Sequence, residues 1–147
     1  MKKNIYILLI ILIIIVGCGK TIEEKELVCT KDITTSNIPM FQTININYIE
    51  GMVDVINSNT LVTLPTEYKS SIDKFIDSFD KQYKEQYGEI NSAKIEISKK
   101  SDTEIYINLL LDYKEMSEEE KETANVVGSN QYSDNKLQLE KKGYTCK

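Results

Sequence analysis

Strict alternation of apolar and polar residues marks several short segments of this chain. In residues 43–48 the apolar side chains are Ile44, Ile46 and Tyr48, each separated from the next by one polar residue. Successive side chains of a strand point to opposite faces, so this pattern predicts a strand with one buried face. Apolar-rich or alternating sequence predicts further strands at residues 27–30, 52–56, 60–64, 94–98 and 104–113.

Turn-forming residues separate some of these segments. Glu50-Gly51 predicts a tight hairpin turn, because Gly adopts positive φ freely. Asn57-Ser58-Asn59 predicts a turn or a bulge between two strands. Segment 104–113 is apolar on both faces, with Tyr106 and Leu110 on the second one. We therefore expect it to be a central strand of an antiparallel sheet, or a strand partly covered on its second face.

After Pro65-Thr66 the apolar residues no longer alternate with polar ones but recur every three or four positions. This spacing predicts a helix of about 20 residues. Gly88 stands where a helix-ending glycine is expected. We expect the apolar stripe to pack on the sheet; a ligand-binding wall is the alternative interpretation of its aromatic rings. The stripe consists of Tyr68, Ile72, Phe75, Ile76, Phe79, Tyr83 and Tyr87.

Two short helices are predicted in the last third of the chain. Ser117-Glu118-Glu119-Glu120 is a capping box, which predicts a helix that ends at residues 126–128. A cation site is the alternative interpretation of its three glutamates. The second helix is predicted to run through Leu137 and Leu139 to Lys142 and to end at Gly143.

The order of these elements predicts one α+β domain over residues 27–147. We expect an antiparallel β-sheet packed on one face by the long amphipathic helix, with short C-terminal helices. After removal of residues 1–17, the remaining 130 residues suit one domain and leave no room for a second of similar size. The closing Tyr144-Thr145-Cys146 is placed to return to the sheet beside the strand that holds Cys29.

The first residues have the pattern of a secretory signal peptide, which we place at residues 1–17. Lys2 and Lys3 precede an apolar run over residues 5–16, and small residues follow it. The alternative is a transmembrane helix that stays uncut, but the run is well short of the about 20 residues that a span needs. Residues 18–26 are then a short charged tether between the export signal and the domain.

Ile15-Val16-Gly17-Cys18 resembles a lipobox, the cleavage and acylation motif of bacterial lipoproteins. The resemblance implies cleavage before Cys18, attachment of diacylglycerol and palmitate there, and a mature protein whose partner is the lipid bilayer. More than one acyl chain is needed for stable anchoring, and this modification supplies it. Dominance of Lys, Ile, Asn and Glu indicates an AT-rich genome. We therefore expect the outer face of the cell membrane of a low-GC Gram-positive bacterium.

Two cysteines remain after Cys18, namely Cys29 near the start of the domain and Cys146 near its end. An even pair in an exported domain predicts a disulfide bond. Two buried thiols are the alternative, which an anaerobic organism would favour. A metal site is not expected, because the chain has no His and two cysteines alone do not close a zinc site.

Charge and missing residue types exclude several functions. The net charge is −5, all 18 basic residues are Lys, and loss of Lys2 and Lys3 makes the balance −7, so we expect no nucleic acid partner. Absence of His removes the usual general base and the Ser-His-Asp and Cys-His arrangements. Acidic pairs such as Asp112 with Glu115 are predicted to be surface residues. We expect no catalytic residues, no cofactor and no enzyme activity.

The layout resembles the YehR-like family of small bacterial lipoproteins. The resemblance is carried by the lipobox, the hairpin around residues 46–53, the helix 66–87, the strand 105–113 and the C-terminal run ending Glu140-Lys141-Lys142-Gly143-Tyr144. It implies an α+β domain at the cell surface with no established biochemical role. This chain differs by its terminal pair, Cys29 and Cys146.

The resulting hypothesis is a membrane-anchored cell-envelope domain that binds an envelope protein or a small ligand. The alternative is a structural or stress-related envelope lipoprotein without a ligand of its own. An exposed apolar patch on the second sheet face, where Tyr106 and Leu110 are expected, would favour a protein partner. A closed apolar pocket with a few polar groups would favour a small ligand.

Overall fold

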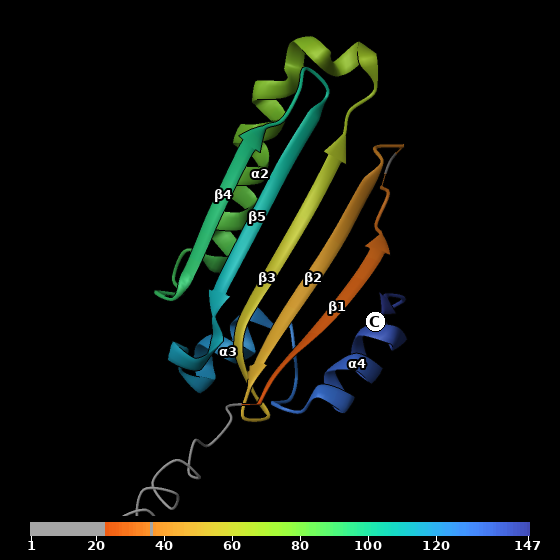
Figure 1. Ribbon diagram of the computed structural model, residues 1–147. Coiled ribbons are helices and arrows are strands. Elements are labelled where there is room, and N and C mark those ends of the chain that lie inside the picture. The colour runs from red at the N-terminus through yellow and green to blue at the C-terminus, as the bar shows by residue number, and fades with distance from the viewer. Residues whose placement is uncertain (1–22, 36) are drawn as a thin grey trace, which may run out of the picture.

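The computed structural model describes residues 23–35 and 37–147, which form a six-stranded antiparallel sheet with helices on one face (Figure 1). The predicted signal peptide, Cys18 and most of the tether lie outside the described residues. The strand order is β4-β5-β3-β2-β1-β6. The strands are β1 (Glu24–Asp32), β2 (Met40–Ile49), β3 (Met52–Thr63), β4 (Ala93–Lys99), β5 (Glu104–Asp112) and β6 (Thr145–Cys146).

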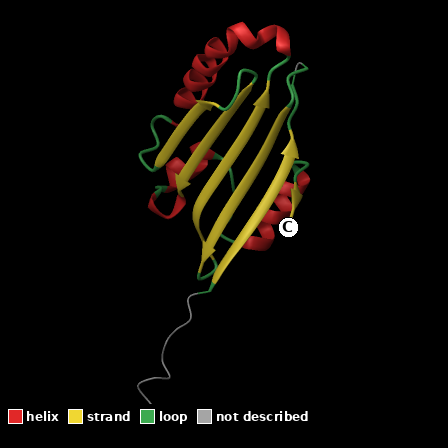
Figure 2. Ribbon diagram, turned by 45° about the horizontal axis from the view of Figure 1, so that its top comes forward, coloured by secondary structure: helices red, strands yellow, loops and turns green. Residues whose placement is uncertain are grey.

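The helices α2 (Ile72–Tyr87), α3 (Glu118–Ala124) and α4 (Tyr132–Lys141) cover the same face of the sheet (Figure 2). α2 packs against β4, and α4 packs against β1 and β6. The predicted α+β class, with one face packed by a long helix and short helices at the C-terminus, is confirmed. The opposite face of the sheet carries no helix among the described residues, and we call it the open face.

Alternation along the strands produces the core as predicted. Ile44, Ile46 and Tyr48 of β2 are buried beneath the helices, and β5 lies between two other strands. One cluster of buried residues lies under α3, α4 and the end of α2, and a second lies under the start of α2. The second cluster consists of Val62, Leu64, Ile72, Ile105 and Ile107.

The long predicted helix is present, but its first part has a different geometry. Residues Thr66–Ser71 form a 3-10 helix, and the α-helix starts only at Ile72. Tyr68 is exposed and contacts the edge of the Phe75 ring, so it does not lie on the sheet-packing stripe. Gly88 ends α2 as predicted, with a φ of −66° rather than a left-handed one. A Cβ at this position would clash with the backbone oxygen of Lys84.

The expected turn at Asn57-Ser58-Asn59 is also wrong, because β3 runs without a break through these residues. Asn57 and Asn59 project onto the open face, where Asn108 Nδ2 donates to both side-chain oxygens at 2.8 and 2.7 Å. These hydrogen bonds occupy amide oxygens that would otherwise favour a turn. The ladder is irregular instead near Asp54, because Asn47 pairs with Val55 and Tyr48 pairs with Val53.

The predicted hairpin turn, the capping box and the glycine after the last helix are all present. Glu50 and Gly51 have φ of 52° and 81°, as a type I′ hairpin turn requires. The capping box of α3 is present, although the helix ends at Ala124, before the expected residues 126–128. Gly143 has a φ of 88° after α4. Positive φ explains why glycine suits positions 51 and 143.

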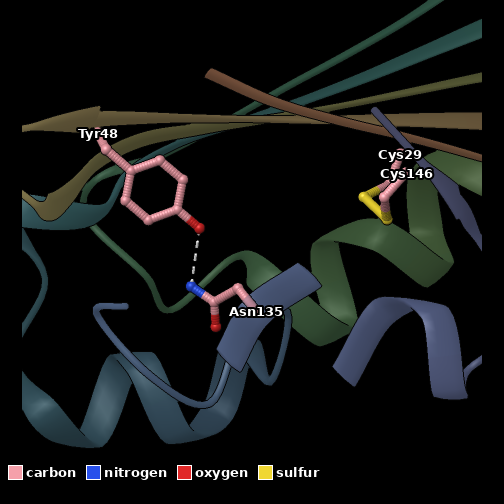
Figure 3. The surroundings of a disulfide bond; sticks show 4 residues. All are labelled: Cys29, Tyr48, Asn135 and Cys146. Atoms are coloured by element: carbon pink, nitrogen blue, oxygen red, sulfur yellow. Dashed lines mark hydrogen bonds between the residues drawn. A yellow bond between two sulfur atoms is a disulfide. The ribbon is translucent and has the colours of Figure 1, made fainter. Parts of the chain in front are cut away.

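Cys29 and Cys146 meet where β6 returns to β1, beside the buried pair Tyr48 and Asn135 (Figure 3). Their sulfur atoms are 1.99 Å apart, so the structure has the predicted disulfide rather than two buried thiols. The bond joins residues 117 positions apart. It therefore ties the first strand of the described domain to its last one.

Candidate functional site

The middle of the open face is polar. Tyr106 donates its hydroxyl to Asn59, and Asn57, Asn59 and Asn108 form one network of side-chain amides. Tyr106 and Leu110 therefore do not join in an apolar patch: Asn108 stands between them along β5. The neighbouring apolar residues of this face are instead Phe41, Leu61 and Tyr106, which are register partners across β2, β3 and β5. Phe41 is 50% exposed and Tyr106 is 36% exposed.

A pocket of about 440 Å³ lies where the open face ends at the last residues of β5, and we call it the β5 pocket. Val55 of β3 and Leu110 of β5 give it apolar walls, together with the methylene stem of Lys94 from β4. Strand register brings these residues together, because Lys94 pairs with Leu110, and Val55 pairs with Asp112. Its volume lies within the range of roughly 300–1,000 Å³ that is usual for small-molecule sites.

Five polar residues complete the lining. Asp112 is the last residue of β5 and lies two positions after Leu110, on the same face of that strand. The other four come from the turn before β4, the short 3-10 helix after β5, and α3; the polar set is Asn91, Ser92, Asp112, Glu115 and Glu120.

The Glu120 carboxylate joins two segments of the chain at the edge of the pocket through hydrogen bonds. Its Oε2 accepts hydrogen bonds from the Ser117 backbone N–H at 2.8 Å and the Ser117 hydroxyl at 3.0 Å. Its Oε1 accepts from the backbone N–H of Asn91 at 3.2 Å. These bonds to Ser117 and Asn91 hold the pKa of Glu120 below its ordinary value. The carboxylate thus fixes the turn before β4 against the start of α3.

Ser92 and Asp112 leave hydrogen-bonding capacity unused. The backbone N–H of Asp112 donates to the backbone oxygen of Ser92 at 3.0 Å, so the two residues are adjacent. Ser92 Oγ and Asp112 Oδ1 are buried and have no hydrogen-bond partner among the described residues. Buried polar atoms without a partner are rare in folded proteins. Their occurrence together marks a polar, unsatisfied spot in the wall of the pocket.

The pocket is acidic, with the carboxylates of Asp112, Glu115 and Glu120 against the ammonium of Lys94. A ligand with a positive charge and an apolar body would match the lining. Among the described residues, no group of three or more His, Cys, Asp or Glu side chains is arranged to hold a metal ion. The described carboxyl groups with a shifted pKa, at Asp32, Asp102 and Glu120, all shift downward, the opposite of a general acid.

Sequence reasoning found part of this site. It named Asp112 with Glu115, Leu110, and the glutamates of the capping box, and the structure brings Asp112, Glu115, Leu110 and Glu120 into one pocket. Glu118 and Glu119 do not line it, and Cys29 and Cys146 lie apart at β1 and β6. Sequence reasoning missed the remaining lining residues, Val55, Asn91, Ser92 and Lys94, because strand register and hydrogen bonds between distant residues bring them to the pocket.

Comparisons with known proteins define the fold and no more. No protein-family model matches this chain, and no curated protein matches it. A protein from Streptococcus pneumoniae TIGR4, solved by NMR, is similar in structure, with a TM-score of 0.56 over 88% of this chain and 87% of that chain. The two sequences are 16% identical, so the similarity concerns the fold alone.

Proposed function

We propose that this chain is a membrane-anchored extracytoplasmic lipoprotein whose domain is a non-catalytic binding module. The charged start, the apolar run over residues 5–16 and the lipobox-like sequence before Cys18 support the location. No described helix has the length and apolar character to cross a bilayer. The order of hairpin, long helix and later strand agrees with the layout on which the resemblance to the YehR-like lipoproteins rests.

The β5 pocket is the observation that supports binding. Its apolar walls and convergent polar groups are the usual composition of a small-ligand site. Three carboxylates against one ammonium favour a cation. Val55 and Leu110 favour an apolar portion next to that charge. The proposed ligand class is therefore a small organic ammonium or guanidinium compound.

Binding fits these residues better than catalysis does. Glu120 is committed to the α3 cap and to Asn91, and its pKa is lowered. The chain contains no His that could act as a general base beside Ser92. Asp112 and Ser92 are therefore assigned to ligand contact.

Matched probes test this proposal on the folded domain, residues 23–147. We would titrate 2-phenylethylammonium, neutral 2-phenylethanol and anionic 3-phenylpropionate into ¹⁵N-labelled protein and follow backbone amide NMR signals. Binding of the ammonium compound alone, with shifts at Ser92, Leu110 and Asp112, is the expected result. Equal responses to all three probes, or shifts elsewhere only, would contradict a cation site.

Two variants identify the side chain that binds the positive charge of the ligand. Asp112→Asn keeps the size of the side chain and removes its charge. We expect roughly ten- to hundredfold weaker binding, since a hydrogen bond to a charged group contributes about 1.5–3 kcal/mol. Asp73→Asn makes the same change on the exposed side of α2 and should leave binding unchanged. Unchanged binding in both variants would contradict the assignment of Asp112 to the charge. Absence of binding by every probe to the wild type would favour the structural envelope role without a ligand.

A further inference from the structure

We propose that the tip of the β2–β3 hairpin, residues 49–52, rests on the lipid bilayer and sets the orientation of the domain. This inference depends on the proposed lipid anchor at Cys18. It adds a second contact with the membrane, made by the folded domain itself.

The hairpin tip exposes two apolar side chains next to each other. Ile49 and Met52 are the last pair of the β2–β3 ladder, on either side of the Glu50-Gly51 turn. Ile49 is 38% exposed and Met52 is 59% exposed, the largest exposed fraction among the described large apolar residues. A lone exposed apolar residue needs no explanation, but Ile49 and Met52 form an apolar pair at the end of the hairpin, with the exposed Glu50 in the turn between them.

The first described residues of the chain, which follow the proposed anchor in the sequence, lie beside this tip. Glu24 opens β1 directly opposite Ile49, and the backbone oxygen of Glu23 accepts a hydrogen bond from the Glu50 N–H at 2.9 Å. β1 and the hairpin thus share one end of the sheet (Figure 1). Cys18 precedes Glu23 by five positions. Five residues span at most about 18 Å, so acyl chains on Cys18 keep the hairpin tip within that distance of the bilayer surface.

The surface next to the tip suits an interface with lipid. A hollow of about 250 Å³ adjoins the tip, with Ile49 and Met52 exposed and Val53 and Tyr113 buried beneath them. Its polar lining consists of Asp54, Lys114, Lys121 and Asn130. An apolar centre with lysines around it is the arrangement found on interfacial membrane-binding surfaces.

Charges around the tip limit the depth of the contact. Lys114 pairs with Asp54 at 3.0 Å, and Lys121 pairs with Glu118 at 2.7 Å. These lysines are therefore partly neutralised, and Glu23, Glu24 and Glu50 of the turn add negative charge. The contact should depend on Ile49 and Met52 more than on anionic headgroups. Shallow insertion of these two side chains is the arrangement that the charges permit.

The contact would also place the β5 pocket close to the membrane. Val55 of the pocket lies three residues after Met52 on β3. The opposite end of the sheet, with the 3-10 helix Thr66–Ser71, would point away from the bilayer. The pocket would then meet its ligand near the lipid surface.

The chain contains no Trp, so a Trp introduced at the tip would be the only source of Trp fluorescence and would report the contact. Met52→Trp would carry the single Trp at the tip. The matched control, Phe41→Trp, puts it at the other end of β2, where Phe41 is 50% exposed. The eight steps from Phe41 to Ile49 span about 27 Å of strand. Both positions are exposed, so neither change disturbs the core.

Full-length lipidated protein of each variant would be reconstituted into phosphatidylcholine–phosphatidylglycerol vesicles, with or without bromine on the acyl chains. We expect the Met52→Trp emission to shift to shorter wavelength and to lose intensity with brominated chains, while Phe41→Trp emission changes in neither way. Protein that floats with the vesicles but shows no quenching at position 52 overturns the tip contact and leaves the anchor standing. Protein that does not float overturns the anchor, and the tip contact with it.

Discussion

Cys29 and Cys146 stand directly opposite each other in the β1–β6 ladder, with their sulfur atoms 1.99 Å apart. The neighbouring backbones also pair, since Lys147 N–H donates to the Val28 oxygen at 2.9 Å. Val28 N–H donates back to Lys147 at 3.4 Å. β6 has only two residues, so the covalent bond fixes a strand that a short ladder alone would hold weakly.

Loss of this disulfide should destabilise the domain strongly. For a closed loop of this length the chain-entropy model gives about 4–5 kcal/mol, because the bond restricts the unfolded chain. We expect the double variant Cys29→Ser with Cys146→Ser to unfold at lower denaturant concentration than the oxidised wild type. Reduced wild type is the control and should resemble the variant. Identical midpoints for variant and wild type in oxidising buffer would contradict the bond.

Ile107→Asp should unfold the domain. Ile107 is 1% exposed on the helix-covered face of β5, so the new carboxylate would be buried without a partner. Leu137→Asp is the matched control, because Leu137 is 52% exposed on α4, and such surface changes usually stay within about 0.5 kcal/mol. Thermal melts followed by circular dichroism would measure both. A normal melt for Ile107→Asp would refute its assignment to the buried face.

Asn135 should stabilise the contact of α4 with the sheet. Its Nδ2 donates to the Tyr48 hydroxyl at 3.0 Å and to the Ser129 backbone oxygen at 2.8 Å, in a fully buried site. Asn135→Ala removes both donors, and we expect a loss of about 1–3 kcal/mol. Tyr48→Phe removes only one partner and should cost less. Denaturant titration of both variants and the double variant gives the coupling, and a value of zero would refute the Tyr48 bond.

The capping box of α3 should make stability depend on acidic pH. The bonds from Ser117 and Asn91 lower the pKa of Glu120 below its unfolded value of 4.5. The stabilisation is therefore complete above about pH 4.5 and is lost as the pH falls through the lower folded pKa. Glu120→Gln should show a smaller loss of stability across this acid range than wild type. Parallel pH profiles of the two proteins would contradict the assignment.

The contribution of the Ser117 N-cap to the stability of the domain should be measurable at neutral pH. Ser117 Oγ accepts from the Glu120 backbone N–H at 3.2 Å, so Ser117→Ala leaves that donor without its partner. A cost of about 1 kcal/mol is usual for such a change. Ser133→Ala is a control in α4, since Ser133 is exposed and makes no cap. Equal stability of the two variants in urea titrations would show that the cap contributes nothing.

Local patterns in the sequence predicted much of this fold, because alternation and turn chemistry act over a few residues. Ile44, Ile46 and Tyr48 share a face through the strand period, and Gly51 and Gly143 occupy positive φ. The continuity of β3 was not predictable in this way. Asn57 and Asn59 favour a turn locally, and it is Asn108 of another strand that keeps them extended.

The candidate site depended on contacts distant in the sequence. Asn91 meets Glu120 across 29 positions, and Val55 meets Asp112 through the β3–β5 register. No local pattern contains such pairs. Sequence reasoning could therefore name Asp112 and Glu115 as acidic candidates but could not assemble a pocket around them.

The N-terminus of the mature protein tests the central claim most directly. Mass spectrometry of the intact chain, extracted from the membranes of cells that express it, would establish its first residue and any attached lipid. The account predicts that the chain begins at Cys18 and carries a diacylglycerol and a further acyl chain on that residue. A chain that begins at Met1, or one that begins at Cys18 without lipid, would contradict the anchor.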